Sequence, residues 1–481
     1  MTEAAGADCA LMIDNVWRAG GHGDWSPILN PVDERMVGRH AVATAADLDD
    51  ALAAAARGFA VWRRTSPIER AGVLQRAASL ILERVGDLAT QLTQEQGKPL
   101  AQARVEFENC ARHFDWCAEE GRRTYGRVVP SAAPGFVLQV RREPIGPVAA
   151  FTPWNFPASQ AAQKIAAALA AGCSIIVKGP EDAPSGCVGL AQCLIDAGLP
   201  PGVLGLVFGD PPMISKHLIE SPVIRKVSFT GSVPVGKHLA GLAAAVMKPC
   251  TMELGGHAPV LVFDDVDPQA VAKTMVAAKF RNAGQVCISP TRFMVHESVY
   301  TPFVDAFVAG AAAVRLGDGL HPATEMGPLV NARRLQAVEA IVSEAVADGA
   351  RLRTGGERVG NSGYLYRPTV LTDVPPTARV LNEEPFGPIA TISSFTDRGE
   401  AMARANSLPY GLAAYAFTES QSNAAFVAEE FESGMVGINT TSIAAAELPF
   451  GGVKESGYGR EGGTEGLGAY LVSKTLAQAL A

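Results

Sequence analysis

The spacing of apolar residues changes along the chain from a helical to a strand-like pattern. Between residues 48 and 62, apolar residues recur three, four or seven positions apart. Thr44 precedes this run with Asp47 three residues later, and Ser66 precedes a second run with Glu69 at the same spacing. Such pairs are typical of capped helix starts, so the sequence predicts two helices near the N-terminus.

From residue 148 onward, short β-rich runs alternate with helix-length segments rich in alanine. Strands separated in this way need crossover connections, which favour parallel sheets with helices on both faces. The sequence therefore predicts an α/β fold with a Rossmann-like first half and a second α/β domain, divided near Gly255 and Gly256. The predicted strands are residues 148–151, 174–178, 203–208, 224–229 and 249–254 in the first half, and 260–263, 292–296, 389–395 and 413–417 in the second.

Composition narrows the class of protein. Hydrophobic residues make up 48% of the chain and charged residues 19%, which fits a globular enzyme. The net charge of −8 argues against nucleic acid as a partner. The most apolar stretch, residues 165–177, is too short to span a membrane, and the N-terminus lacks a signal peptide. Eight cysteines without a CxxC pair predict neither a metal site nor a disulfide framework, so we expect a cytoplasmic protein.

Two nucleotide-binding motifs match only in part. Residues 231–238 resemble a Walker A loop, but His238 stands where the Mg²⁺-binding hydroxyl is required. A glycine turn that enters a helix, or a pyrophosphate site at that helix start, is the better interpretation. Residues 457–462 fit GxGxxG, but no predicted strand precedes them and they fall outside the alternating series. We therefore interpret that match as a coincidence.

Polar residues follow several predicted strands of the first half. Asn155, Lys178, Ser232 and Glu253 each lie at or just after such a strand. Ligands of open parallel sheets bind beyond the carboxyl ends of the strands, so these side chains are expected to face one crevice.

Cys287 is the candidate nucleophile because its neighbours are small and polar, a setting that favours a reactive thiolate. A nucleophilic cysteine needs a base, and the candidates are His257 and Glu253. The glycine pair after Glu253 would let another segment approach closely. A papain-like Cys-His pair stays open on these residues alone.

Six segments occurring in order resemble the aldehyde dehydrogenase superfamily over nearly the whole chain. The closest similarity is to bacterial succinate-semialdehyde dehydrogenases, carried by residues 280–284, 436–440 and 449–463. The six segments are residues 153–157, 229–236, 253–256, 284–287, 384–388 and 449–461.

The resemblance implies three parts in the chain: an NAD-binding domain (residues 1–125 and 143–255), a catalytic domain (256–465) and an oligomerisation element (126–142 and 466–481). Dimers or tetramers are the usual assembly of this family. Residues 136–142 and 469–475 read as strands without partners in their own domain, so we expect them to pair across subunits.

The resemblance also implies a mechanism. Cys287 attacks the aldehyde, and Asn155 with the Cys287 amide stabilises the oxyanion. Hydride leaves to the nicotinamide, and Glu253 activates the water that hydrolyses the thioester. The implied cofactor contacts are Trp154, Lys178, Glu181, Gly231, Ser232, Gly236, Leu254, Glu384 and Phe386, and the implied substrate contacts are Phe156, Gln160, Gln163, Arg281 and Phe450.

Departures from the succinate-semialdehyde pattern refine these expectations. Glu181 would repel a 2′-phosphate, so NAD is expected to be preferred, with NADP as the second cofactor. Of two arginines and a serine that grip the distal carboxylate in such relatives, only Arg281 is present; Gln163 and Ala444 occupy the other positions. We expect a small polar aldehyde, or a semialdehyde held by Arg281 alone. A CoA-acylating enzyme and a non-catalytic relative are the alternatives; Glu253 argues against the first, and Cys287 with Asn155 against the second.

Overall fold

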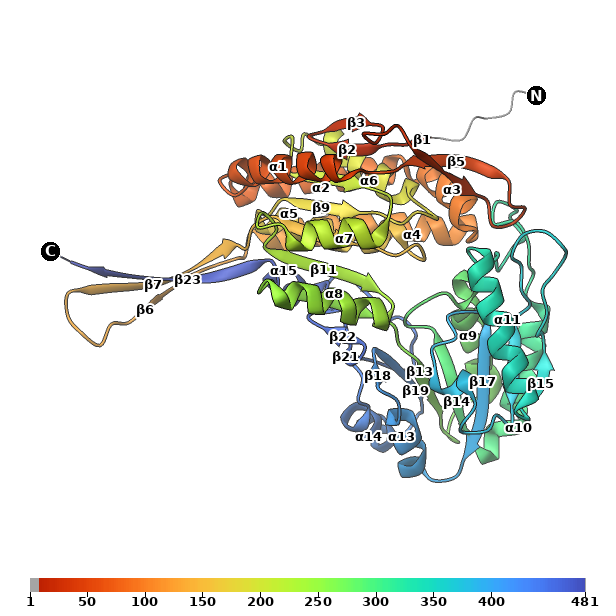
Figure 1. The fold of residues 1–481 in the computed structure, drawn as a ribbon. Coiled ribbons are helices and arrows are strands. Elements are labelled where there is room, and N and C mark those ends of the chain that lie inside the picture. The colour runs from red at the N-terminus through yellow and green to blue at the C-terminus, as the bar shows by residue number, and fades with distance from the viewer. Residues whose placement is uncertain (1–7, 481) are drawn as a thin grey trace.

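The computed structural model describes residues 8–480 and places an eight-stranded sheet in the first half of the chain (Figure 1). Five strands are parallel and correspond to the five predicted ones, each within two residues at either end. Their residues are almost all buried, which explains the apolar runs of β8, β9 and β10. In sheet order they are β12 (Cys250–Leu254), β11 (Lys226–Gly231), β8 (Val148–Phe151), β9 (Ile175–Lys178) and β10 (Leu204–Val207).

The order of these strands creates a switch point in the sheet. From β8 the chain proceeds to β9 and β10 on one side, and β11 and β12 then fill the other side. Connections therefore leave β8 and β11 in opposite directions, and a crevice opens between their carboxyl ends. The residues after these two strands, around Asn155 and Ser232, lie at that crevice.

Helices cover both faces of this sheet, as predicted. One layer contains α2 (Pro67–Glu83), α3 (Val85–Gln96), α4 (Leu100–Gly121), α5 (Pro157–Ala171) and α6 (Ser185–Asp196), and the other contains α1 (Ala45–Trp62), α7 (Pro211–Glu220) and α8 (Val233–Ala245). The predicted helix starts are confirmed: Thr44 with Asp47 and Ser66 with Glu69 form reciprocal capping boxes. β2 (Leu11–Ile13) and β3 (Val16–Arg18) add an antiparallel edge that was not predicted.

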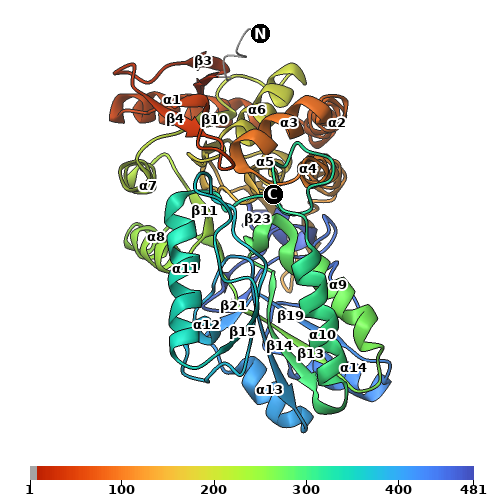
Figure 2. The same ribbon diagram turned by 90° about the vertical axis from the view of Figure 1, so that its right-hand side faces the viewer.

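A seven-stranded sheet organises the second half of the chain (Figure 2). All of its pairs are parallel except that between β15 and β16. Four strands confirm the prediction, and β15, β16 and β20 were not predicted. In order they are β15 (Arg351–Thr354), β16 (Thr369–Thr372), β17 (Ile389–Phe395), β14 (Pro290–His296), β13 (Ala258–Val262), β19 (Ala413–Phe417) and β20 (Met435–Ile438). The flanking helices are α9 (Pro268–Phe280), α10 (Glu297–Ala313), α11 (Ala332–Ala347), α13 (Arg398–Asn406) and α14 (Gln421–Glu430).

Three antiparallel strands form an arm that stands away from both sheets (Figure 1). β7 (Phe136–Pro144) pairs along its whole length with β23 (Leu471–Ala479), and β6 (Arg127–Val129) pairs with its other edge. The sequence correctly predicts the two strands, but it did not predict that they pair with each other within one subunit. They pair with each other because the chain returns to the base of the arm through α15 (Gly463–Gly468).

The GxGxxG segment also has a structural role that the sequence did not predict. Its first residues form β22 (Gly457–Tyr458), which pairs antiparallel with β12 at the edge of the first sheet. It is therefore part of that sheet and not outside it, although it makes no strand-to-helix turn of the dinucleotide-binding type. The two-residue strand β21 (Val453–Lys454) precedes it and pairs with β18 (Tyr410–Gly411).

The remaining elements are β1 (Asp8–Cys9), β4 (Trp25–Leu29) and β5 (Met36–Ala41), which form a small sheet, and the short helix α12 (Arg379–Asn382). Within residues 8–480, no helix is long and apolar enough to cross a membrane.

Candidate active site

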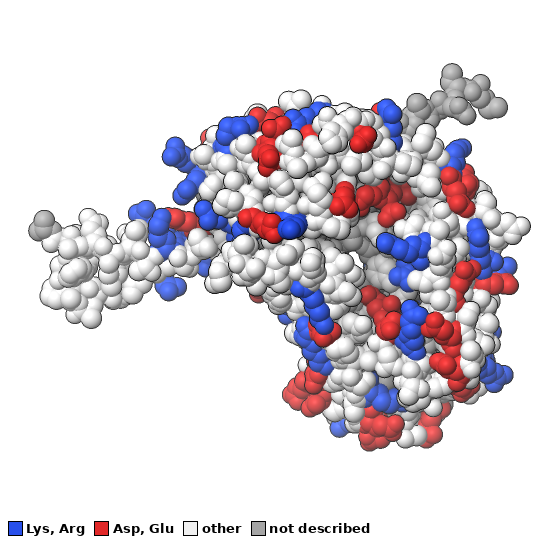
Figure 3. Space-filling view, viewed as in Figure 1, with Lys and Arg blue, Asp and Glu red and all other residues white. Residues whose placement is uncertain are grey.

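A left-handed turn presents Cys287 to the space between the two α/β units. Asn282, Ala283 and Gly284 follow α9 with φ angles of 50°, 53° and 70°. A side chain at Gly284 would place its Cβ 2.1 Å from the carbonyl oxygen of Gly387, so only glycine fits. The turn leaves Cys287 half-buried. Figure 3 shows the molecule hollowed between these units, with charges of both signs around the opening.

Asn155 lies against this turn. Its side chain is buried, and its Nδ2 donates one hydrogen bond to the carbonyl oxygen of Gln285 at 3.0 Å. An amide nitrogen carries two hydrogens, so one is left to donate. The backbone amide of Cys287 has no acceptor within the described part of the chain. Two N–H groups beside the sulfur are thus available to a developing oxyanion.

The electrostatic surroundings of the Cys287 thiol differ from the sequence-based expectation of a thiolate. Burial raises the pKa of Cys287 to about 12, and the nearby carboxylates of Glu384 and Glu253 raise it further, while Arg281 opposes them. The expectation from sequence did not include burial, because Cys287 packs against the hydrophobic core of the second sheet. The thiol is therefore protonated at neutral pH in this state and must lose its proton before it attacks.

Glu253 lies at the end of β12 and is only 2% exposed. Neither of its carboxylate oxygens has a hydrogen-bond partner among residues 8–480. Burial raises the pKa of Glu253 well above its usual range, and the neighbouring Glu461 raises it further. Its Oε1 approaches Gly451 so closely that a Cβ there would lie 2.7 Å away. Such a carboxyl is suited to exchange a proton with a water or a thiol.

A buried ion pair behind Glu253 was missed by the sequence-based reasoning. Lys164 on α5 forms an ion pair with Glu461 and donates a hydrogen bond of 2.7 Å to Thr230. Lys164 lowers the pKa of Glu253 while Glu461 raises it, so the two members of the ion pair have opposite effects on the pKa of the proposed base. The available signal was a lone lysine inside the alanine-rich segment that forms α5.

His257 is excluded as the base of a Cys-His pair. Its Nδ1 lies 2.6 Å from the Thr291 hydroxyl, and its Nε2 lies 3.0 Å from the carbonyl oxygen of Val380. Burial also lowers the pKa of His257 well below its usual range. Both ring nitrogens are therefore used in holding the second sheet, and the papain-like alternative is withdrawn.

The glycine pair after Glu253 lets a distant loop approach, as expected. The amide of Gly256 donates to Glu384 Oε1 at 3.3 Å, and a Cβ on Gly255 would lie 2.2 Å from Glu384 Oε2. Burial raises the pKa of Glu384 to about 8. Phe386, two residues later, packs edge-on against Trp154 with ring centroids 5.6 Å apart. This loop joins the two units beside Cys287.

The start of α8 is suited to bind a phosphate group. Ser232 is the N-cap residue, but its hydroxyl makes no capping bond, and Gly231 precedes it at the end of β11. A Cβ on Gly236 would lie 2.3 Å from Leu254 Cδ2, so this glycine lets α8 pack closely on β12. Helix starts at such a switch point bind pyrophosphate. Lys237, the Walker A lysine by position, forms an ion pair with Glu455, which disfavours the nucleotidase interpretation.

Lys178 and Glu181 are adjacent at the end of β9. They form an ion pair in which the lysine is nearly buried and the glutamate is 37% exposed. The arrangement leaves part of the Glu181 carboxylate exposed and the ammonium of Lys178 nearly buried. These two groups, with the open start of α8, fit a dinucleotide.

The predicted substrate contacts come from three segments: Phe156, Gln160 and Gln163 at the start of α5, Arg281 after α9, and Phe450. The Arg281 guanidinium lies 5.4 Å from the centre of the Phe156 ring. Gln160 is buried and Gln163 half-buried, and the Oε1 of each has no hydrogen-bond partner among the described residues. Gln163 Nε2 lies 3.2 Å from Nε2 of His113, a residue that the sequence did not single out. Phe450 pairs with Glu461 through two backbone hydrogen bonds and is buried.

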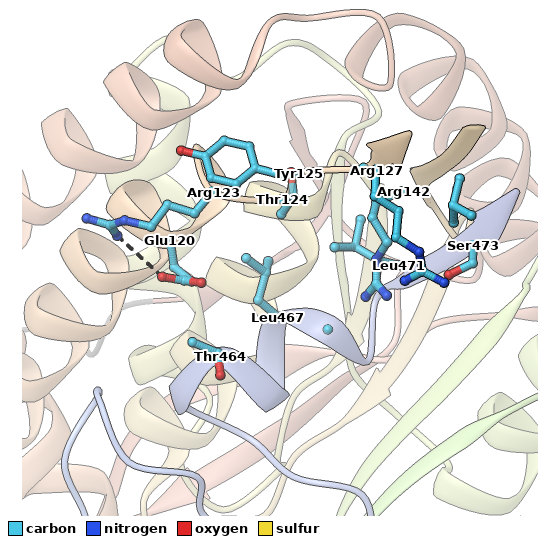
Figure 4. Close-up of a pocket in the computed structure, with 13 residues that line it drawn as sticks. Glu120, Arg123, Thr124, Tyr125, Arg127, Arg142, Thr464, Leu467, Leu471 and Ser473 are labelled. Carbon is cyan, nitrogen blue, oxygen red and sulfur yellow. Dashed lines mark hydrogen bonds and ion pairs between the residues drawn. The ribbon is translucent and has the colours of Figure 1, made fainter. Parts of the chain in front are cut away.

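A cavity of about 360 Å³ lies elsewhere, at the base of the arm. Arg127 and Arg142 project into it beside Leu467 and Ser473 (Figure 4). It is lined by α15, the arm strands and the end of α4, and it holds none of the predicted site residues.

Comparisons with known proteins agree with this geometry. Residues 17–476 match the model of the aldehyde dehydrogenase family. The 4-(hydroxymethyl)benzenesulfonate dehydrogenase TsaD1 of Comamonas testosteroni is 46% identical over 464 residues, covering 96% of this chain and 97% of that protein. A 3-sulfolactaldehyde dehydrogenase of Pseudomonas putida is 41% identical, covering 96% and 95%. A solved structure of succinate-semialdehyde dehydrogenase from Burkholderia pseudomallei has a TM-score of 0.96 at 41% identity, covering 98% of each chain.

Proposed function

This chain belongs to the aldehyde dehydrogenase family and oxidises an aldehyde to its carboxylic acid with NAD(P), and we propose that Cys287, Asn155 and Glu253 carry out that reaction. The observation that carries the proposal is the convergence of three complementary groups. A half-buried thiol lies beside two available N–H donors, and a buried carboxyl without partners lies close enough to alter the pKa of that thiol.

The proposed mechanism uses each group for what its surroundings allow. Cys287 gives up its proton to solvent water and its sulfur adds to the aldehyde carbon, while Asn155 and the Cys287 amide bind the oxyanion. A nicotinamide held at Trp154, Glu384 and Phe386 would supply the acceptor for the hydride of this tetrahedral adduct. Glu253, in its carboxylate form, then takes a proton from the water that hydrolyses the thioester on Cys287.

We propose that residues 1–125 and 143–255 form the cofactor domain and residues 256–465 the catalytic domain. The change from the first sheet to the second between β12 and β13 supports this division. Trp154, Leu254, Glu384 and Phe386 would hold the nicotinamide end, and Gly231, Ser232 and Gly236 the pyrophosphate.

The preferred cofactor is proposed to be NAD. The Glu181 carboxylate can accept hydrogen bonds from a ribose 2′-hydroxyl and would repel a 2′-phosphate. Lys178 offsets part of that repulsion through its ion pair with Glu181.

The substrate is proposed to be a small polar aldehyde with a distal anionic group. Arg281 provides a positive charge beside Phe156. Burial lowers the pKa of His113 to about 4, so its ring is neutral. If the positions of the amide oxygen and nitrogen of Gln163 are exchanged, the oxygen accepts a hydrogen bond from His113. Both amide hydrogens are then available to a ligand. Such a donor-rich end suits a carboxylate or a sulfonate, and two relatives are named for substrates that carry a sulfonate group.

The test is a substrate panel with NAD and NADP, following the absorbance of the reduced cofactor. Succinate semialdehyde, 3-sulfolactaldehyde and 4-sulfobenzaldehyde represent the two anions, and butanal, hexanal, benzaldehyde and a hydroxyaldehyde are the uncharged comparisons. Arg281→Ala should lower kcat/KM for the anionic aldehydes by about tenfold or more, because a charge-assisted contact is lost. Butanal should be unaffected. If the wild-type kcat/KM for hexanal or benzaldehyde is tenfold higher than that for the anionic aldehydes, the proposed substrate class is wrong.

The reaction itself has a separate test. Cys287→Ala should abolish turnover with every aldehyde while NAD still binds. A panel with added CoA distinguishes hydrolysis from acyl transfer, because formation of an acyl-CoA would favour the acylating alternative. Turnover of any aldehyde by the wild type would exclude the alternative that the protein is a non-catalytic relative.

We also propose that the protein is a homodimer or homotetramer. The arm is a three-stranded sheet without a core of its own, and Val128 (71% exposed), Val472 (41%) and Phe136 (47%) place apolar surface on it. A second copy would cover that surface. Light scattering of the purified chain measures the assembly. The cysteines, all free in residues 8–480, support a reducing, cytoplasmic location.

A further inference from the structure

A fully buried ion pair lies next to Asn155 and is not used by the mechanism above. Lys98 and Glu106 both have side chains that are 0% exposed. Lys98 follows α3, and Glu106 lies on α4. Removing two such charges from water is costly unless every group finds a partner. The contacts that satisfy this pair therefore indicate what it holds in place.

Lys98 is directed at the backbone of the proposed oxyanion site. Its Nζ donates to the carboxylate of Glu106 and to the carbonyl oxygen of Asn155, the latter at 2.8 Å. The ammonium also lies 4.1 Å from the centre of the Phe156 ring. Lys98 thus contacts both residues of the peptide that links Asn155 to α5.

Glu106 fixes the other end of the same segment. Its Oε1 accepts hydrogen bonds from the amides of Ala158 (3.0 Å) and Ser159 (3.1 Å), which belong to the first turn of α5. A carboxylate at this position satisfies amides that have no partner within the helix. The pair therefore holds residues 155–159 at both ends.

A second donor completes the attachment on the nucleophile side. Asn282 Nδ2 donates to the same Asn155 carbonyl at 2.9 Å and to the Gln285 carbonyl at 3.3 Å. Gln96 in turn donates to Asn282 Oδ1 at 3.0 Å. The Asn155 backbone is thus fixed to the turn that carries Cys287, and the side chain of Asn155 points to that turn as well.

We propose that Lys98, paired with Glu106, is a positioning residue that holds the Asn155 amide at the oxyanion of the Cys287 adduct. Without the ammonium, the Asn155 carbonyl loses a charge-assisted hydrogen bond and the loop gains freedom. A displacement of about 1 Å in a positioned donor lowers a catalysed rate by about 10²-fold. The inference rests on the proposed role of Asn155, and Lys98 itself touches no reacting atom.

The test compares single-turnover rates of hydride transfer, seen as the burst of reduced cofactor. The variant is Lys98→Met with Glu106→Gln, which removes both charges with little change in volume, so that no unpaired charge is buried. We expect the burst rate to fall 10- to 100-fold, with NAD affinity and thioester hydrolysis within threefold of wild type. Lys226→Met is the matched control, because Lys226 is also buried but donates to Thr251 and not to the Asn155 loop; its burst rate should stay within threefold.

A double-mutant comparison isolates the route through Asn155. In an Asn155→Ala background the Lys98 and Glu106 changes should slow the burst by less than threefold, because the positioned donor is already gone. The positioning role would be overturned if the Asn155 change and the Lys98 and Glu106 changes slowed the burst by factors that multiply in full. A parallel loss of NAD binding and thioester hydrolysis would also overturn it. An unchanged burst in the folded Lys98 variant would do the same. If Asn155→Ala alone leaves the burst intact, the proposed oxyanion role fails instead.

Discussion

Gly236→Ala is expected to weaken NAD binding because it forces α8 away from β12. The added Cβ would lie 2.3 Å from Cδ2 and 2.7 Å from Cδ1 of Leu254, a buried side chain. Carbon atoms at rest lie about 3.5 to 4.0 Å apart, so at least one group must move by about 1 Å. Either α8 shifts or Leu254 changes rotamer, and both lie at the proposed cofactor groove.

The substitution has two opposing effects on stability and a separate effect on binding. Overpacking lowers the free energy of unfolding by about 1 to 3 kcal/mol, and replacing glycine by alanine in a helix raises it by about 0.5 to 1 kcal/mol. If the shift moves one amide of the α8 start away from the pyrophosphate, a further 1.5 to 3 kcal/mol of binding energy, roughly, is lost. Each 1.4 kcal/mol is about tenfold, so the Kd for NAD should rise by roughly 10- to 100-fold.

Gly241→Ala is the matched control on the same helix. A Cβ at this position meets no atom within 4 Å, so the substitution should stabilise the helix slightly and leave NAD binding unchanged. Titration calorimetry with NAD and thermal unfolding of both variants measure the two effects. Equal NAD affinity in Gly236→Ala and Gly241→Ala would refute the argument that close packing of α8 on β12 positions the phosphate site.

Three other predictions follow from the site. Glu253→Gln should retain the burst of reduced cofactor but slow the steady state by roughly 10²-fold, and loss of the burst would place Glu253 at an earlier step. The pKa of Glu253 is raised by burial and by Glu461, so the hydrolysis rate should increase with pH through that raised value. Glu461→Gln should move this rise to lower pH, and an unmoved profile would contradict it. Glu181→Ser should improve kcat/KM for NADP relative to NAD; an unchanged ratio would remove Glu181 from cofactor choice.

The sequence by itself determined the alternation of strands and helices and most of the candidate site. Parallel strands buried on both faces are mostly apolar, so β8 and β19 could be placed to the residue. The capping pairs at Thr44 and Ser66 act within one helical turn, which makes them readable without tertiary information. Cys287, Asn155 and Glu253 could be proposed from the sequence because each lies in a short motif that resembles the family.

The tertiary structure alone decided which distant groups meet and in which protonation state. Burial and the carboxyl groups of Glu384 and Glu253 raise the pKa of the Cys287 thiol, and the neighbours of Cys287 in sequence do not reveal them. The partners of β7 and β22 come from the C-terminal end of the chain, since strand pairing depends on where the chain returns and not on the strand itself. The ion pairs of Lys98 and Lys164 were likewise not predictable, because a buried charge is identified by its partners, and these lie on separate elements.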